Sequence, residues 1–332
     1  MSPSQPQLSI IVPAYNAQDT IRRCIDSLLN QTYSDFEIIA VEDSSTDSTL
    51  QTLEKYAQTE DRMRLFHKDN TGIGDARNFG LECARGAFIA WLDADDWAEP
   101  HMLERMMNAA MQYEAQAVVC NYFRHDLSSG KASVVSHRFD SPYNRSFTSD
   151  WQLFAERPFV WNKLFSAELI RNHALKFASA STYEELPFVY AALAHANKVV
   201  VIDDALLHHV YGDSSSLMGS SVADGKRIFE ALQSTYDYFE EHFKLNKQAK
   251  DQMCAMFLRQ IFSRVLRLKS CEDKEFKIAF VNDAFDFLDG LFDSWRKNPY
   301  YLIDKKASIK AATKIAMLSR RFWFVSIKAG VL

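Results

Sequence analysis

The sequence predicts an α/β protein: a doubly wound, mostly parallel sheet flanked by helices, followed by an all-helical C-terminal region. Within the first 120 residues, short apolar runs of strand length alternate with longer segments in which apolar residues recur at helical spacing. These runs are apolar almost throughout, which is typical of parallel strands buried on both faces. Beyond residue 221 only long helical patterns follow, and they predict the helical region.

The first strands and helices alternate strictly along the chain. We expect strands at 8–12, 36–41, 63–67 and 87–92. Between them, helices are expected at 17–30, 47–58 and 73–84. In the first helix, Ile21, Cys24, Ile25 and Leu28 fall on one face. This order builds a doubly wound sheet with right-handed crossovers.

The later elements are less regular. A helix after Pro100 leads to a fifth strand at 117–121, and a weak strand is expected at 132–136. Further helical patterns lie at 151–155, 162–172 and 183–196, and short strands at 199–202 and 206–210. Long helices are expected at 223–243, 247–269, 276–291 and 308–324. The Gly- and Ser-rich stretch 212–221 marks a boundary between domains of residues 1–220 and 221–332.

Composition and cysteine usage indicate an ordinary globular protein of the cytoplasm. The chain has 332 residues, 47% hydrophobic and 24% charged, enough for a sizeable core plus a smaller second unit. Residues 1–7 lack the features of a secretory signal, and no stretch reaches the roughly 18 apolar residues that span a bilayer. The five cysteines are far apart, which argues against disulfides and zinc.

The C-terminal tail has a charge opposite to that of the rest of the chain. From Arg296 onward, nine basic residues face one acid, a balance of +8, whereas the remainder carries −13. A helix over 305–328 would bring five basic side chains close to one stripe: Lys306, Lys310, Lys314, Arg321 and Lys328. With aromatic and apolar residues on its other faces, this tail suits an anionic membrane surface. The alternative is a docked helix with a solvated basic face, and the acidic body argues against nucleic acid.

Three polar loops follow strands that should end at the same edge of the sheet. The first contains residues 13–16, the second residues 42–45 and the third residues 93–97. In open α/β sheets, ligands bind in the crevice at this edge, near the point where the strand order reverses. Five carboxylates, those of Glu42, Asp43, Asp93, Asp95 and Asp96, would crowd this crevice.

The clustered aspartates predict a divalent metal. Two charges about 4 Å apart repel by roughly 4 kcal/mol at an effective dielectric near 20, so Asp93, Asp95 and Asp96 destabilise one another. Oxygen ligands favour Mg²⁺ or Mn²⁺, and the ion would also neutralise a bound diphosphate. Capping of the following helix is the alternative for Asp43, but it does not explain three aspartates after one apolar strand.

Other nucleotide-binding classes lack their motifs in this chain. A dinucleotide-dependent dehydrogenase needs glycines directly after the first strand, where the sequence has AYNAQ at 14–18. Gly72 and Gly74 follow the third strand and lack the third glycine at its required spacing. No Walker sequence is present, so the dehydrogenase and P-loop hypotheses both fail.

At these loops the chain resembles the family 2 glycosyltransferases, which are inverting enzymes of the GT-A fold. The matching stretches are SIIVPAYN at 9–16, VEDSSTD at 41–47, ARNFG at 76–80, FIAWLDADDW at 88–97, WNKL at 161–164 and YEELPF at 183–188. Their order and spacing, over residues 8 to about 215, carry the resemblance.

The resemblance implies roles residue by residue. The nucleotide-sugar donor would be held by Pro13, Ala14, Tyr15, Asn16, Glu42, Asp43, Arg77, Asp93 and Ala94. Asp95 would ligate Mn²⁺ or Mg²⁺, with Asp93 and Asp96 in support. His208 and His209 follow the last strand, where a further metal ligand often lies, and we expect His209 if either binds. A structural role for both histidines is the alternative.

The general base of the family is an acidic residue at the start of a helix, which falls here on Glu184 and Glu185. It would take the acceptor proton as the acceptor oxygen attacks the anomeric carbon opposite the diphosphate. Residues 181–184 also fit a capping box, which would make Glu184 structural, so Glu185 is the first candidate. The chain departs from the family by Glu185 in place of Asp and by Ser44 in place of a turn glycine.

The resulting hypothesis is a metal-dependent hexosyl- or N-acetylhexosaminyltransferase. It would move a sugar from a nucleotide diphosphate donor, expected to be a UDP-sugar, to a hydroxyl of a glycan or glycolipid. Two alternatives stay open. One is a sugar nucleotidyltransferase, which normally has a Gly- and Arg-rich loop after the first strand; the other is an inactive nucleotide-sugar-binding protein.

Overall fold

The computed structural model describes residues 5–127, 129–137, 143–146, 151–179, 182–211, 226–268, 271–303, 317 and 319–331. The chain divides into two compact units. The first contains residues 1–149 and 156–219, and the second contains residues 150–155 and 220–332.

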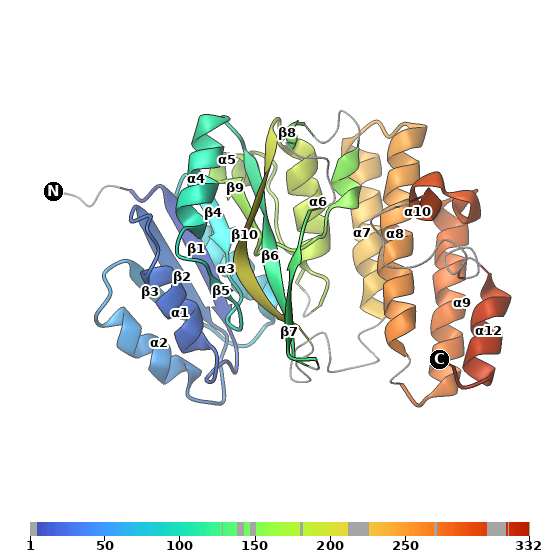
Figure 1. Cartoon of the computed structure of the whole chain (residues 1–332), viewed down its shortest axis with the longest axis horizontal. Helices are drawn as coiled ribbons and strands as arrows, with labels where there is room; N and C mark the ends of the chain where they lie inside the picture. The colour runs from blue at the N-terminus through green and yellow to red at the C-terminus, as the bar shows by residue number, and fades with distance from the viewer. Residues whose placement is uncertain are drawn as a thin grey trace. The chain divides into compact units, whose positions relative to one another are not determined.

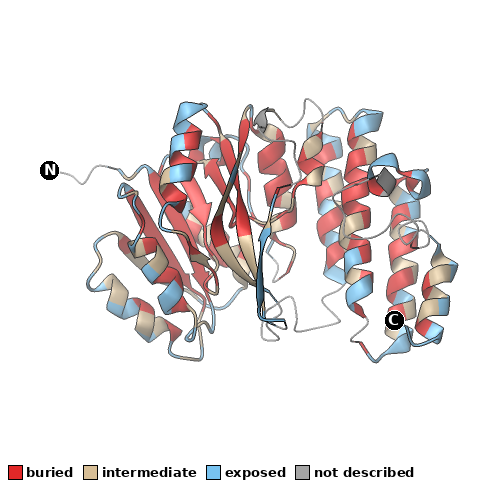
Figure 2. Cartoon of the chain, viewed as in Figure 1, coloured by how far each residue is buried: buried red, intermediate tan, exposed pale blue. Residues whose placement is uncertain are grey.

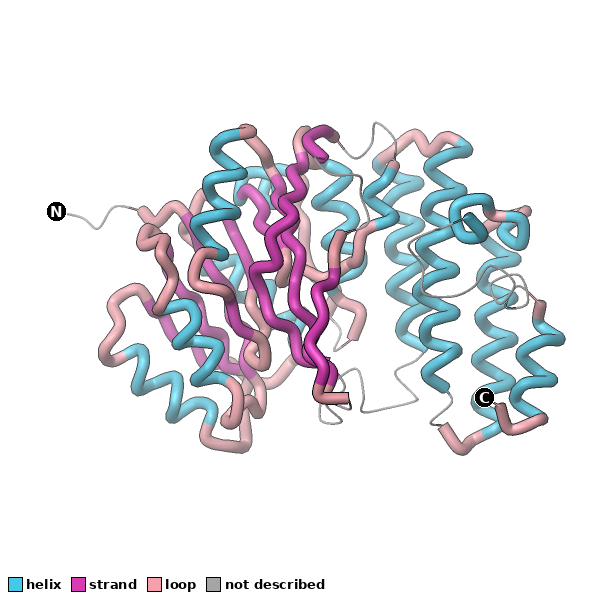
Figure 3. Tube along the Cα trace, in the orientation of Figure 1, coloured by secondary structure: helices cyan, strands magenta, loops and turns pink. Residues whose placement is uncertain are grey.

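The first unit is built on one mixed sheet (Figures 1 and 3). One half contains, in spatial order, β3 (Met63–His67), β2 (Phe36–Glu42), β1 (Leu8–Ala14) and β4 (Phe88–Trp91). These four strands are parallel, so their carboxyl ends lie at one edge. Because β1 lies between β2 and β4, the strand order reverses at β1, and a crevice is expected at this edge.

The other half of the sheet mixes directions. Its spatial order is β9 (Lys163–Ser166), β6 (Ala117–Asp126), β10 (Val199–Tyr211) and β5 (Trp97–Ala98). β6 and β10 are parallel to each other, whereas β9 and β5 are antiparallel to their neighbours. Two short strands, β7 (Lys131–Val135) and β8 (Tyr143–Arg145), pair with β6 and β10. The predicted mostly parallel α/β sheet is confirmed.

Helices cover both faces of the half of the sheet that contains β1 and β2, which explains why these strands are mostly apolar (Figure 2). Every residue of β1 and β2 is buried. Ile10 belongs to the same buried cluster as residues of α1 and α4, while Ile11 on the opposite face lies against Gly80 of α3. The helices of this unit are α1 (Ile21–Leu29), α2 (Thr49–Ala57), α3 (Ile73–Cys83), α4 (Met102–Gln112), α5 (Ala167–Asn172) and α6 (Glu185–His195).

The helix predicted over 162–172 is wrong in its first part. Residues Lys163–Ser166 form β9, and α5 begins only at Ala167, with the Ser166 side chain accepting a hydrogen bond from Leu169 N. β9 lies between β4 and β6, where Leu164 and Phe165 are both buried. A strand of four residues is too short to show its own alternation. Likewise, the two short strands predicted at 199–210 form one strand, β10, with an irregular register after Ile202.

The second unit is helical, as expected for the C-terminal region. It contains α7 (Arg227–His242), α8 (Lys247–Arg267), α9 (Lys274–Leu291), α10 (Pro299–Ile303) and α12 (Arg320–Lys328), with 3₁₀ turns η2 (Gln152–Ala155) and η5 (Trp295–Lys297). Residues 150–155 belong to this unit, whereas the boundary predicted at residue 220 puts them in the first domain. The Phe154 ring packs on Phe239 at 5.0 Å between centroids, and Phe154 O accepts a hydrogen bond from Arg259 Nη2 at 2.5 Å.

α12 packs into the helical unit through the face that the membrane prediction needs exposed. Trp323 and Ile327 are buried, and the Trp323 ring stacks on Phe262 at 5.8 Å. The predicted apolar membrane-facing surface is therefore wrong for these two residues, although Arg321 and Lys328 are exposed. Lys306, Lys310 and Lys314, with most of the predicted helix 308–324, lie outside the described residues. No helix in the described ranges combines the length and apolar character needed to cross a membrane.

Gly86 lies where the backbone of β1 leaves no room for a side chain. A Cβ there would lie 2.5 Å from Ser9 N, 2.7 Å from Leu8 C and 2.8 Å from Phe88 O, all of them backbone atoms. Gly86→Ala should therefore lower the free energy of unfolding of the first unit by about 1–3 kcal/mol, measured by urea denaturation.

Gly290 in α9 is the matched control, because a Cβ there meets nothing within 4 Å. Gly290→Ala should raise the free energy of unfolding of the second unit by about 0.5–1 kcal/mol. Destabilisation of similar size by the two substitutions would contradict the packing described for Gly86.

Candidate active site

The loops after β1 and β2 are joined by hydrogen bonds that depend on two unusual backbone conformations. Asn16 and Ser44 both have left-handed backbones, with φ of 47° and 56°. Asn16 N donates to Ser45 Oγ at 3.0 Å, and Thr46 N donates to Asn16 Oδ1 at 2.8 Å. Asn16 therefore holds the second loop in place at the carboxyl edge of the sheet.

The residues predicted to hold the nucleotide differ in exposure. Pro13 and Ala14 are buried at the end of β1, and Ala14 O accepts a hydrogen bond from Asp43 N at 2.9 Å. Tyr15, by contrast, is 45% exposed, and Asn16 is exposed beside it, so a base or ribose could reach both side chains. Ala94 is buried within the turn after β4.

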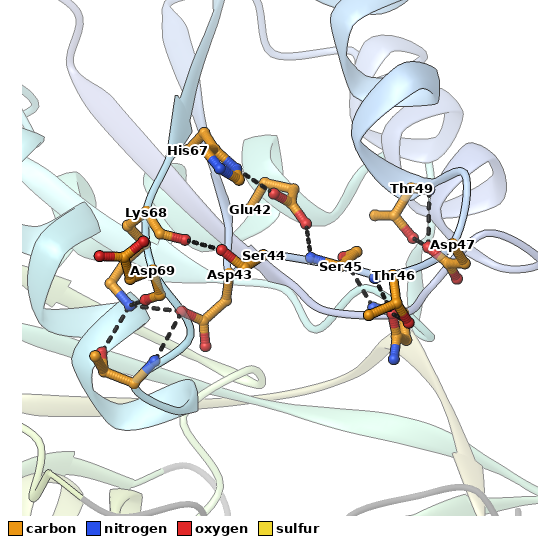
Figure 4. A network of polar contacts seen from close by, with 12 residues as sticks. Glu42, Asp43, Ser44, Ser45, Thr46, Asp47, Thr49, His67, Lys68 and Asp69 are labelled. Carbon is orange, nitrogen blue, oxygen red and sulfur yellow. Dashed lines mark hydrogen bonds and ion pairs between the residues drawn. The ribbon is translucent and has the colours of Figure 1, made fainter.

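Both carboxylate oxygens of Glu42 contact neighbouring residues of the protein (Figure 4). It has no exposed surface, and its Oε2 lies 2.6 Å from His67 Nδ1. Its Oε1 accepts a hydrogen bond from Ser45 N at 2.5 Å. Burial alone would raise the pKa of Glu42, but the bonds from Ser45 and the contact with His67 outweigh it and lower that pKa. Glu42 therefore shapes the loop as a carboxylate.

Asp43 holds the segment that leads into α3 (Figure 4). Its Oδ1 lies 2.5 Å from Lys68 Nζ, and its Oδ2 accepts from Gly72 N at 3.1 Å. Gly72 is the N-cap residue of α3, so Asp43 does not cap α2, the helix that follows it. The capping alternative for Asp43 is thus wrong in its details, although the residue does stabilise a helix start.

The acidic turn after β4 reaches a histidine of β10. Asp96 N donates to Asp93 O at 3.0 Å, which closes the turn. The buried Asp96 carboxylate lies 3.1 Å from His209 Nδ1 through each of its oxygens and also accepts from Val210 N at 3.2 Å. No described residue bonds His209 Nε2. The arrangement is that of a carboxylate that orients an imidazole for a ligand on its other nitrogen.

His208 is bound differently from its neighbour. Its Nε2 lies 2.6 Å from Glu99 Oε1 and its Nδ1 lies 2.8 Å from His125 Nε2. Its ring stacks on Trp97 with centroids 4.7 Å apart. Both nitrogens are therefore in contact with protein groups, and of the two histidines only His209 has one free for a ligand among the described contacts.

Asp95 has no side-chain partner among the described residues. Burial raises the pKa of Asp95 to about 7, and the charges of Asp96 and Asp93 act in the same direction, against His209. A divalent cation would relieve this repulsion, and carboxylate oxygen with imidazole nitrogen is a donor set that Mn²⁺ accepts. Within the described ranges, no three His, Cys, Asp or Glu side chains converge to form a complete metal centre. Asp95 and His209 could hold a cation if a diphosphate and water supplied its other ligands.

Arg77 joins the acidic turn to the start of α6. Its side chain is buried, its Nη2 donates to Asp93 Oδ1 at 2.7 Å, and its Nη1 donates to Glu184 Oε1. Nη1 also lies 3.9 Å from Glu185 Oε2. Burial would lower the pKa of Arg77, but the surrounding carboxylates of Asp93, Glu184 and Glu185 outweigh it and raise that pKa. Arg77 is thus a permanent cation held among three acids.

Glu184 and Glu185 have different surroundings. Glu184 is the N-cap residue of α6 but makes no capping bond, so the capping-box alternative is wrong: its carboxylate binds Arg77 instead. Glu185 Oε2 accepts a hydrogen bond from Val160 N at 3.0 Å, and no described residue bonds its Oε1. Burial raises the pKa of Glu185 to about 8; Arg77 opposes the rise, and Glu184 and Asp93 add to it. Each glutamate has one oxygen that no described residue bonds, but the Glu185 side chain is the more exposed, at 18% against 6% for Glu184.

Three groups in this site carry no signal in the sequence analysis. Arg23 of α1 donates from Nη2 to Asp95 O at 2.8 Å and lies over the Trp97 ring, 3.8 Å from its centroid. Lys68 binds Asp43, and the backbone N–H of Val160 binds Glu185. Arg23 lies on the polar side of an amphipathic helix, where a sequence pattern indicates only solvent, and backbone donors have no sequence signature.

Ser44 adopts the backbone conformation for which glycine is the usual residue, with φ at 56°, and its Oγ donates to Lys68 O at 2.8 Å. Ser44→Ala keeps the strained backbone and loses the bond, so it should lower the free energy of unfolding by about 1 kcal/mol. Ser44→Gly also loses the bond but removes a backbone cost of about 1–2 kcal/mol, and it should match the wild type or exceed it. Urea denaturation of the pair is the measurement, and an Ala variant as stable as the Gly variant would contradict the assignment.

Comparison with known proteins agrees with this geometry. The sequence profile described as Glycosyl transferase family 2 matches residues 9–174. EpsH and EpsJ of Bacillus subtilis, both named as glycosyltransferases, are each 32% identical to this chain, over 74% and 75% of it and 73% and 74% of their own lengths.

Two solved structures share the fold. Residues 1–349 of TarS from S. aureus, in complex with UDP-GlcNAc, match with a TM-score of 0.76 at 21% identity, covering 98% of this chain and 92% of that one. The mannosyltransferase PcManGT from Pyrobaculum calidifontis, in complex with GDP-Man and Mn²⁺, matches with a TM-score of 0.56 at 16% identity, covering 98% and 88%. The predicted GT-A fold is confirmed, and the chain belongs to glycosyl transferase family 2.

Proposed function

We propose that this glycosyltransferase is a metal-dependent, inverting enzyme that transfers a hexosyl or N-acetylhexosaminyl group. The observation that carries the proposal is the contact of Arg77 with both Asp93 and Glu184. It brings the acidic turn at the switch point of the sheet next to the first turn of α6. A donor side and an acceptor side are thereby adjacent, as a single displacement requires.

The donor side consists of the loops after β1, β2 and β4. Asp95 and His209 would hold Mn²⁺ or Mg²⁺, with Asp96 orienting the imidazole and Asp93 facing the ribose and sugar. When bound, the cation would neutralise the diphosphate and the negative charge that develops on it as a leaving group. Tyr15 and Asn16 extend from the edge of the sheet and would contact the nucleotide, while Pro13, Ala14, Glu42, Asp43 and Ala94 shape the loops around it.

The acceptor side is the start of α6. Glu185 would take the proton of the acceptor hydroxyl on its free Oε1 while Val160 N holds its Oε2. Glu184 would keep Arg77 in place as its counter-ion. The donor sugar is expected on UDP, in line with the UDP-GlcNAc named for the TarS complex, and the acceptor is expected to be a glycan or glycolipid.

The site of action is proposed from the sequence. A cytoplasmic protein that lies on the inner face of the membrane would meet lipid-linked acceptors. The four lysines from Lys305 to Lys314 that would provide most of the contact lie outside the described residues. Membrane association therefore stays a prediction, now without the apolar face that Trp323 and Ile327 would have given.

Asp95→Asn should abolish metal-dependent donor binding. Wild-type protein should melt at a higher temperature when Mn²⁺ and UDP are added together, because binding to the native state raises its stability. The Asn variant should lose this rise and lose transfer. Without metal it should be at least as stable as the wild type at pH 8, because one of three repelling charges is gone.

The exposed Asp61→Asn is the matched control for this substitution and should behave as the wild type. Transfer at the full rate in excess EDTA, or an unchanged response of Asp95→Asn to Mn²⁺, would rule out the metal proposal.

Glu185→Gln should keep donor binding but lose transfer by about 10²–10⁴-fold, since the substitution removes only the proton acceptor. The raised pKa of Glu185, about 8, has a further consequence. The base works only when ionised, so kcat/KM of the wild type should rise tenfold per pH unit below about 8 and then level off.

Glu184→Gln distinguishes the two neighbouring glutamates. If it abolishes transfer and Glu185→Gln stays active, the base is Glu184. If neither substitution changes the rate or the pH profile, the base is another residue.

A further inference from the structure

Lys163 is fully buried inside a turn formed by the residues just before it in the chain. Its Nζ lies close to four oxygen atoms: Phe159 O at 2.8 Å, Asn162 Oδ1 at 2.8 Å, Arg157 O at 3.0 Å and Glu156 Oε1 at 3.3 Å. All four are acceptors, and one belongs to the buried carboxylate of Glu156, so these contacts favour the ammonium form, although burial lowers the pKa of Lys163. The turn is therefore wrapped around a positive charge.

The candidate base lies on the opposite side of one peptide unit of this turn. Lys163 binds the carbonyl of Phe159, and the next N–H, that of Val160, donates to Glu185 Oε2 at 3.0 Å. In a trans peptide the C=O and the N–H point in opposite directions. The Phe159–Val160 peptide therefore lies between the ammonium and the carboxylate, with its dipole aligned to both charges.

The ends of the turn are held by other contacts. Tyr190 Oη of α6 donates to Glu156 O at 2.8 Å, and Asn162 Nδ2 donates to Cys120 O of β6 at 2.8 Å. Lys163 holds the middle of the turn from the inside. The contacts with α6 and β6 therefore fix the two ends of the turn. Lys163 fixes the Phe159–Val160 peptide between them, and with it the direction of the Val160 N–H.

We propose that Lys163 is a positioning residue for the catalytic base: through the Phe159–Val160 peptide it fixes and polarises the N–H that holds Glu185. Hydrogen bonds in series strengthen one another in a low-dielectric interior. A donor polarised by a cation also favours the ionised form of its acceptor. The inference rests on the proposed role of Glu185 and gives a function to a residue that does not touch the substrate.

The charged groups that face Glu185 come from four elements. They are Arg77 of α3, Glu184 beside it in α6, Asp93 after β4, and Lys163 of β9. Burial raises the pKa of Glu185, and the bond from Val160 N lowers it. Without the Lys163 charge this bond is weaker, so Glu185 should take up its proton at a higher pH.

The test is the pH profile of donor hydrolysis by the full chain with Mn²⁺, using whichever of UDP-glucose, UDP-galactose and UDP-GlcNAc turns over fastest. In Lys163→Met, the midpoint of the rise in kcat/KM should move up by about one pH unit, which lowers the rate at pH 7 about tenfold. KM for the donor should stay within about twofold, because the donor side is not touched. Replacing Val160 by its α-hydroxy acid deletes the N–H and weakens the Phe159 carbonyl as an acceptor, and it should shift the midpoint in the same direction.

Arg64→Met is the matched control. It removes a cation that is only partly buried and pairs with Glu37 at 2.9 Å, and it should lower stability without moving the midpoint. A folded Lys163→Met with the wild-type midpoint would overturn the inference. If Lys163→Met does not fold, the hydroxy-acid variant decides alone, and an unshifted midpoint there overturns it.

Glu185→Gln separates this inference from the function on which it rests. If Glu185→Gln keeps the wild-type profile, the assignment of the base is wrong. If it loses the rise with pH while the Lys163 and Val160 variants keep the wild-type midpoint, only the role of Lys163 fails.

Discussion

The buried guanidinium of Arg77 is the interaction on which the arrangement of the site depends. α3 carries it to a place where Asp93, from the end of β4, and Glu184, from the start of α6, both reach it. Breaking a buried ion pair by removing one partner typically costs about 3–5 kcal/mol, because the remaining charge stays buried without compensation. The acidic turn and the start of α6, which carries the proposed base, are therefore held together electrostatically, and a change in one should affect the other.

The same region holds more acid than its buried cations neutralise. Glu42 and Asp43 have partners of their own and act as parts of the scaffold. Asp95 has no side-chain partner among the described residues, and Glu185 has a described hydrogen bond on only one oxygen; burial raises the pKa of both. Strongly perturbed carboxylates in one crevice are typical of functional sites. The negative charges of the two carboxylates would be neutralised in different ways. A bound cation would neutralise Asp95, and a proton taken from the acceptor hydroxyl would neutralise Glu185.

Much of the first unit could be predicted from the sequence because β1 to β4 lie within apolar runs that are separated by segments of helical period. β1 to β4 and their polar loops follow directly from that pattern. β9 could not be predicted, since its four residues show no period of their own and its place between β4 and β6 is decided by the assembled sheet. The ion pair of Glu184 with Arg77 could not be predicted either, because Arg77 lies 107 residues away in the chain. The local sequence at 181–184 matches a capping box, which offers another role for Glu184.

Some of the site residues could likewise be predicted from the sequence, and others could not. Acidic residues after an apolar strand are a signal that the sequence carries, and Asp93, Asp95 and Asp96 do share one turn. The orienting groups carry no such signal. Val160 acts through a backbone N–H that every residue except proline has, and the ammonium of Lys163 lies inside a turn that only the fold creates.

The proposed mechanism is tested most directly by a crystal structure with Mn²⁺ and a non-hydrolysable UDP-sugar analogue. It predicts a cation bound by Asp95 and His209 Nε2 on the diphosphate, with Glu185 facing the anomeric carbon on the side opposite the diphosphate. A cation bound elsewhere, or a diphosphate on the same side of the sugar as Glu185, would contradict it.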